Sequence, residues 1–181
     1  LPSAFTFIGM WHSARCPLDD ELLAYLQSIH PFINRFYRSI YKKFCDEITV
    51  RVKALRQGCP CTTTAGQPGK GLDCGAITMP RQLEIVEELV QDAIQRGAKL
   101  CAGGHRVEGS NGLFFAPTVL TDVDHTMRVV LEEAFGPVML VIPFDSDEQV
   151  IEYANSTQYG LGCSIFSTDY ARAERIGKVP E

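Results

Sequence analysis

Apolar residues recur every three or four positions in two long parts of the chain. Between residues 40 and 55 this spacing predicts a helix with one apolar face, and we expect it to end at Gly58. A second helix is predicted to begin at Pro80, where a missing N–H costs nothing, and to end at Gly97. Residues 59–70 between the two helices are rich in Gly, Pro and Thr and predict a loop.

Short apolar runs bounded by turn residues predict the strands that follow. The longest of them, Val138–Phe144, is apolar without alternation, which is typical of a strand buried on both faces. Ser146 and Gln149 have capping-box spacing, which predicts a helix that ends near Asn155. Further extended segments are 99–102, 113–115, 118–120 and 162–166, and a last helix covers 169–176. Helices and strands that alternate in this way indicate an α/β domain with a largely parallel sheet and flanking helices.

The charge balance argues against nucleic-acid and membrane partners. The 181 residues include 17 Lys and Arg against 22 Asp and Glu, a net charge of −5, whereas nucleic acids and anionic membranes require a basic surface. The longest apolar run is far short of the roughly 20 residues that cross a bilayer. Seven cysteines without a regular framework predict reduced thiols, and we therefore expect a cytoplasmic protein.

The cysteine and histidine residues predict no metal site. Cys59 and Cys61 form a close pair without the further His or Cys that a four-ligand site needs. His105 and His125 have no carboxylate or thiol at ligand spacing, so we expect both in surface loops. We expect the remaining thiols to behave as small buried apolar residues, namely Cys45, Cys74, Cys101 and Cys163.

The segment Glu132–Val138 combines two carboxylates, an aromatic ring and a turn just before the predicted buried strand. Gly136 and Pro137 define the turn, so that Glu133 and Phe135 are directed rather than merely solvated. A carboxylate beside a ring can hold a ribose and the nicotinamide attached to it. The same residues are also compatible with an acidic helix end in which Phe135 fills the core.

This segment, E-E-A-F-G-P-V in one-letter code, resembles a hallmark of the NAD(P)-dependent aldehyde dehydrogenase superfamily. Other parts of the chain resemble the family in the same order, at residues 35–37, 40–44, 73–76, 81–82, 97–99, 103–104, 115–120, 154–155, 159–161 and 165–167. The resemblance covers residues 35–178 and implies an incomplete aldehyde dehydrogenase catalytic domain. It also implies that Glu133 binds the ribose hydroxyls of NAD or NADP and that Phe135 contacts the nicotinamide, while Glu132 has no assigned role.

The reaction that the resemblance implies is the oxidation of an aldehyde to a carboxylic acid. In the family a cysteine thiolate attacks the aldehyde, hydride passes to NAD(P), and a water activated by a glutamate releases the acid. A backbone N–H and an asparagine amide stabilise the intermediate. The implied protein is an oxidoreductase whose small-molecule partner is an aldehyde.

The nucleophile of the family has no counterpart in this chain. Its G-Q-x-C segment would fall at residues 28–34, which contain no cysteine, and His30 lies near the expected position. The general base, with its E-L-G-G segment, and the Gly-rich cofactor-binding half lie further upstream in the family. We therefore expect residues 1–34 to be a divergent or foreign leader and residues 35–181 to be the family segment.

Three functions follow from this reading of the sequence. The first is a truncated aldehyde dehydrogenase segment, inactive alone, whose residues name neither the aldehyde nor the choice between NAD and NADP. The second is a non-catalytic module derived from the family, which associates with a partner or with full-length subunits, or forms a homo-oligomer. The third is an α/β ligand-binding domain outside the family, and the segment Glu132–Val138 argues against it.

Overall fold

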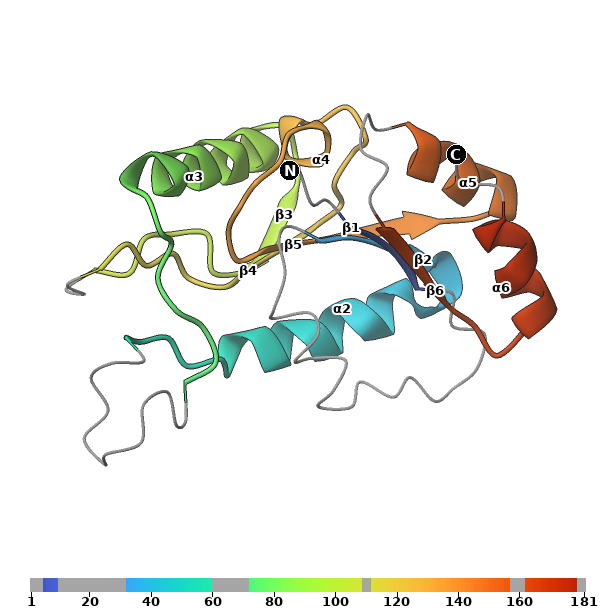
Figure 1. Ribbon diagram of the computed structural model, residues 1–181, viewed down its shortest axis with the longest axis horizontal. Helices are drawn as coiled ribbons and strands as arrows, with labels where there is room; N and C mark the ends of the chain where they lie inside the picture. The colour runs from blue at the N-terminus through green and yellow to red at the C-terminus, as the bar shows by residue number, and fades with distance from the viewer. Residues whose placement is uncertain (1–4, 10–31, 60–71, 109–111, 157–161, 179–181) are drawn as a thin grey trace.

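The computed structural model describes residues 5–9, 32–59, 72–108, 112–156 and 162–178. Its strands are β1 (Phe5–Gly9), β2 (Phe32–Tyr37), β3 (Lys99–Ala102), β4 (Thr118–Thr121), β5 (Val138–Phe144) and β6 (Gly162–Phe166). Its helices are α2 (Arg38–Lys53), α3 (Pro80–Gln95), α4 (Arg128–Leu131), α5 (Asp147–Asn155) and α6 (Tyr170–Gly177). Together they form one sheet with helices on both of its faces (Figure 1).

The sheet has six strands in the order β3-β4-β5-β2-β1-β6. Strand β3 is antiparallel to β4, whereas each of the other pairings along the sheet is parallel. In β5 every residue except Pro143 is buried, because helices cover both faces of this interior strand (Figure 1). The prediction of an α/β fold with a largely parallel sheet and flanking helices is confirmed.

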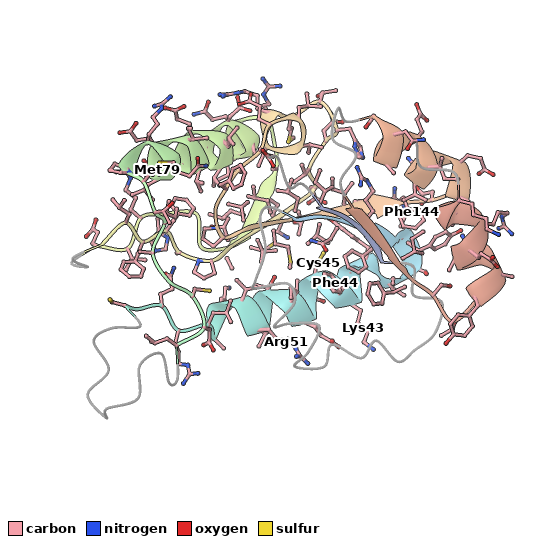
Figure 2. All side chains as sticks on the ribbon, viewed as in Figure 1. Lys43, Phe44, Cys45, Arg51, Met79 and Phe144 are labelled. Carbon is pink, nitrogen blue, oxygen red and sulfur yellow. The ribbon has the colours of Figure 1, made fainter. Side chains whose placement is uncertain are left out.

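Helix α2 covers one face of the sheet with the apolar stripe that the sequence predicts. Phe44, Ile48 and Val52 are buried against the strands. Figure 2 shows Lys43 and Arg51 on the opposite side of the helix, directed away from the sheet. The three- and four-residue spacing of the apolar positions therefore decides which side of α2 faces the core.

The end of α2 differs from the prediction. The helix ends at Lys53 and not at Gly58. Gln57 forms an isolated bridge with Cys74, and the N–H of Gly58 donates to the carbonyl of Cys74 at 3.1 Å. The Gln57 side chain donates to the carbonyl of Phe115 at 2.7 Å. Hydrogen bonds to distant parts of the chain thus replace the last helical turn.

Helix α3 covers the opposite face, together with the short helix α4 (Figure 1). It begins at Pro80 as predicted, and Gly97 follows it with a φ of 104°, which a residue with a side chain rarely adopts. Its buried residues form a core with the β4 and β5 side chains Leu120 and Leu140, and they are Leu83, Val86, Leu89, Val90 and Ala93.

The strands β3, β5 and β6 and the cap of α5 follow the sequence closely, and one extended segment does not. The backbone N–H of Gln149 donates to the Ser146 side chain at 3.2 Å, which confirms the predicted start of α5. Residues 113–115 form no strand in the described part of the chain, where Phe115 makes an isolated bridge with Arg106.

Strand β1 was not predicted, and it occupies an interior place in the sheet. Its residues pair in parallel with β2 on one side and with β6 on the other. The predicted helical spacing over residues 18–29 and His30 lie outside the described residues. Part of the first 34 residues is therefore built into the same sheet as the rest of the chain.

Candidate functional site

The candidate site is the loop of residues 132–137, which connects α4 to β5. The N–H of Thr118, the first residue of β4, donates to the carbonyl of Pro137 at 2.8 Å. Strand β2 begins beside β5, with Phe32 opposite Met139. Because β4, β5 and β2 are parallel, all three begin at one edge of the sheet, and the loop lies at that edge.

Backbone hydrogen bonds and a buried alanine hold this loop in place. The N–H of Gly136 donates to the carbonyl of Ala134 at 2.7 Å, and the N–H of Val138 donates to the carbonyl of Gly136 at 2.8 Å. The side chain of Ala134 is fully buried. The neighbouring Glu133 and Phe135 are half-buried, so both are partly accessible on a fixed backbone.

The two adjacent glutamates of the motif have different surroundings. Glu132 accepts two hydrogen bonds from the Arg128 guanidinium, at 2.6 and 3.0 Å, and this pairing lowers the pKa of the Glu132 carboxyl. The Oε1 atom of Glu133 is buried and has no hydrogen-bond partner. A buried acceptor without a donor costs about 1–3 kcal/mol, and a bound hydroxyl would recover that cost.

Helix α3 packs directly against the loop, and a polar residue lies on this helix one turn before the point of contact. A Cβ built on Gly136 would lie 2.5 Å from Val86 Cγ2, so the helix approaches the loop as closely as a glycine permits. Gln82 lies one turn before Val86 on α3, and its buried Nε2 atom has no hydrogen-bond partner. A polar residue on the apolar stripe, four positions before Val86, is the sequence signal that could have revealed it.

The arrangement suits the nicotinamide–ribose end of a dinucleotide. The buried Glu133 oxygen can accept a hydrogen bond from a sugar hydroxyl. The buried Gln82 amide can donate a hydrogen bond to a sugar hydroxyl. The half-buried ring of Phe135 offers an apolar surface for a flat heterocycle. The residues of the site therefore fit the group that the resemblance implies.

His125 is not the surface-loop residue that we expected. Its ring is half-buried and stacks on the Tyr153 ring, with centroids 3.4 Å apart. Burial first, and then the nearby Arg35 guanidinium, lower the pKa of His125 to about 4. His105 is exposed, as expected.

The thiols of Cys45 and Cys74 resemble packing groups more than nucleophiles. Cys45 is half-buried between α2 and the sheet, and burial raises its pKa to about 11. Burial likewise raises the pKa of Cys74. A high pKa keeps a thiol protonated and weakly nucleophilic. Within the described ranges no group of three or more His, Cys, Asp or Glu residues could hold a metal ion, and no helix is long and apolar enough to cross a membrane.

The chain is similar to known proteins over most of its length. The aldehyde dehydrogenase family profile matches residues 35–179. A probable succinate-semialdehyde dehydrogenase [NADP(+)] of Sinorhizobium fredii is 35% identical over 150 residues, which are 82% of this chain and 29% of that protein. The 4-trimethylaminobutyraldehyde dehydrogenase A of Danio rerio is 36% identical over 144 residues, 77% of this chain and 27% of that protein.

Solved structures share the fold over almost the whole chain. Lactaldehyde dehydrogenase from Escherichia coli superposes with a TM-score of 0.80 at 27% identity, covering 97% of this chain and 36% of that one. Betaine aldehyde dehydrogenase from Staphylococcus aureus, in complex with NAD+, has a TM-score of 0.79 at 26% identity and covers 97% and 35%. The chain spans 29% of the length of the Sinorhizobium fredii relative and 27% of the Danio rerio relative.

Proposed function

The chain belongs to the aldehyde dehydrogenase family, and we propose that it forms the part of an NAD(P)-dependent enzyme that holds the nicotinamide–ribose end of the cofactor. The observation that supports this most is the buried, unpartnered Glu133 oxygen in the E-E-A-F-G-P-V segment. When bound, the cofactor accepts the hydride that leaves the aldehyde carbon on oxidation to the carboxylic acid. The aldehyde is therefore the proposed substrate.

Three residues of the loop and one residue of α3 have distinct parts in this proposal. Glu133 accepts hydrogen bonds from the ribose hydroxyls, and Gln82 donates to the same sugar. Phe135 contacts the nicotinamide ring and shields it from water. Gly136 allows α3 to approach closely, because any larger residue would meet Val86. The chain's own residues thus bind and orient, while the bond-making groups of the family mechanism are not assigned to any of them.

A second candidate is a non-catalytic module that associates with full-length subunits of the family. It is favoured by one observation, namely that residues 28–34 contain no cysteine where the family has its nucleophile. Under this candidate the loop retains its shape while the chain oxidises nothing. Association with full-length subunits, as partner or as mixed oligomer, would then be its activity.

The cofactor assignment is tested by Glu133→Gln in the 181-residue chain. We expect the affinity for nicotinamide mononucleotide, followed by chemical-shift changes in NMR titrations, to fall about tenfold, because a charged acceptor is replaced by a neutral one. Glu152→Gln is the matched control, since Glu152 is an exposed glutamate of α5 and is not part of the loop. Its titration should coincide with that of the unchanged chain.

A derivative of nicotinamide mononucleotide whose 2′- and 3′-hydroxyls are joined as an isopropylidene acetal separates the ribose contact of Glu133 from the nicotinamide contact of Phe135. The blocked derivative should bind weakly and equally to the unchanged chain and to Glu133→Gln. If Glu133→Gln leaves the affinity for nicotinamide mononucleotide intact, Glu133 does not bind the ribose and the proposed function is wrong.

A further inference from the structure

We infer that Arg128 is a positioning residue for Glu133, because it binds the neighbouring Glu132 and so leaves one of two adjacent carboxylates for the cofactor. This inference rests on the proposed function. It assigns roles to Arg128 and Glu132, and the family resemblance gives neither of them one.

The Arg128–Glu132 pair has the two-pronged geometry that fixes both side chains. Arg128 Nε lies 2.6 Å from one carboxylate oxygen of Glu132, and Nη2 lies 3.0 Å from the other. A planar guanidinium matches a carboxylate in this way, whereas a lysine ammonium is a single point of contact. Each Glu132 oxygen therefore accepts a charge-assisted hydrogen bond from Arg128.

The backbone separates the two glutamates at the same place. Glu132 ends α4 with a φ of −106° and a ψ of 146°, which is extended geometry, and its N–H donates to the carbonyl of Arg128 at 2.7 Å. Because the chain has left the helix at Glu132, Glu133 does not continue the helix face that carries the ion pair. The fully buried Ala134 then anchors the chain on the other side of Glu133.

Arg128 also lies near two carboxylates of α3. Its pairing with Glu132, and then the nearby carboxylates of Asp92 and Glu88, raise the pKa of Arg128. Asp92 is also paired with Arg96, at 3.1 Å between Oδ2 and Nε. Arg128 therefore lies near the carboxylates of α3 while it binds Glu132, and the same helix packs against Gly136.

Without Arg128, the carboxylate of Glu132 is released one residue away from Glu133. The two like charges then repel each other, and both can compete for the same hydroxyl donors. The four-residue helix α4 also loses the contact that closes its last turn. The consequence is a Glu133 side chain that spends less time in the geometry that binds ribose.

The test is a double-mutant cycle on binding. We expect Arg128→Gln to lower the affinity of the 181-residue chain for nicotinamide mononucleotide about threefold, with binding of the isopropylidene derivative unchanged. Arg128→Lys should recover part of the loss.

The decisive combination is Arg128→Gln with Glu133→Gln. If Arg128 acts through Glu133, the double variant binds as weakly as Glu133→Gln alone. An equal threefold loss in both backgrounds overturns the positioning role. If Glu133→Gln alone has no effect, the proposed function fails whatever Arg128 does. Denaturation midpoints of all variants, measured alongside, separate binding from folding.

Discussion

At the residue scale, His125 illustrates how a side chain gains an unusual environment. Its ring stacks on Tyr153, and both of its ring nitrogens are buried without a hydrogen-bond partner. Arg35 is fully buried nearby and donates from Nη2 to the carbonyl of Tyr153 at 2.8 Å. Protonating His125 would place a second positive charge in this partly desolvated place.

Stability should therefore depend on pH through His125. Its pKa is lowered from 6.5 to about 4 in the folded chain, so between these values the unfolded chain binds a proton that the folded chain does not. The contribution of His125 to the free energy of unfolding is complete above about pH 6.5 and is lost as the pH falls toward 4. We expect a loss of about 2 kcal/mol, less than the whole shift implies because the ring is partly exposed to solvent.

Urea unfolding of the chain and of His125→Phe, recorded at intervals from pH 7.5 down to pH 4, measures this effect. The phenylalanine keeps a flat ring against Tyr153 and removes the titrating group. The variant should have a shallower pH dependence over this range. Parallel curves for the two proteins would mean that His125 does not titrate differently on folding.

At the element scale, β1 is the strand that joins β6 to the rest of the sheet. Its residue Ile8 lies opposite Arg35 of β2 and opposite Ile165 of β6. An interior parallel strand has hydrogen-bonding neighbours on both sides, so each of its N–H groups is committed to the ladder. Without β1, the strands β2 and β6 would each present an unpaired edge.

The substitution Ile8→Pro tests this dependence. Proline removes an N–H and fixes φ, which costs about 3 kcal/mol or more inside a sheet or helix. We expect the variant to lose the cooperative unfolding transition, or to unfold at a much lower urea concentration, in far-UV circular dichroism. Ile8→Val keeps the N–H and the β-branched shape and serves as the control. A proline variant as stable as the control would show that β1 is dispensable.

At the scale of the whole molecule, the described sheet has an open edge at each end. The curated relatives of this chain are much longer proteins. Strands β3 and β6 stand at the two ends of the described sheet. Leu100 of β3 is 39% exposed and Val50 of α2 is 70% exposed. Open edges and exposed apolar side chains favour association with other protein. This chain matches 27–29% of the length of two curated relatives, and the rest of each relative is further protein of the sort that could cover such edges.

The chain alone should form no NADH or NADPH from an aldehyde. We expect this because burial raises the pKa of the Cys45 and Cys74 thiols and residues 28–34 contain no cysteine. The measurement is the absorbance at 340 nm with a panel of aldehydes and either cofactor, with a full-length member of the family as the positive control. Turnover by the 181-residue chain would contradict the expectation. Co-purification with that full-length protein, without turnover, would favour the non-catalytic module.

The sequence by itself determined the elements whose contacts are local or periodic. The stripe from Leu83 to Ala93 predicts α3, the unbroken apolar run of β5 predicts an interior strand, and Ser146 with Gln149 predicts the cap of α5. Each of these signals depends on residues a few positions apart, so it can be read along the chain. The segment Glu132–Val138 also identifies the family and, through it, Glu133 and Phe135 as candidates.

The tertiary structure alone decided what depends on residues far apart. It ended α2 early, because Gln57 and Gly58 bond to Cys74 and Phe115. It inserted β1 between β2 and β6, although β6 lies more than a hundred residues further along the chain.

The same holds within the candidate site. Two adjacent glutamates of identical chemistry differ because Arg128 pairs with Glu132, whereas one carboxylate oxygen of Glu133 is buried. Burial and pairing are properties of the folded chain as a whole, and no local pattern contains them.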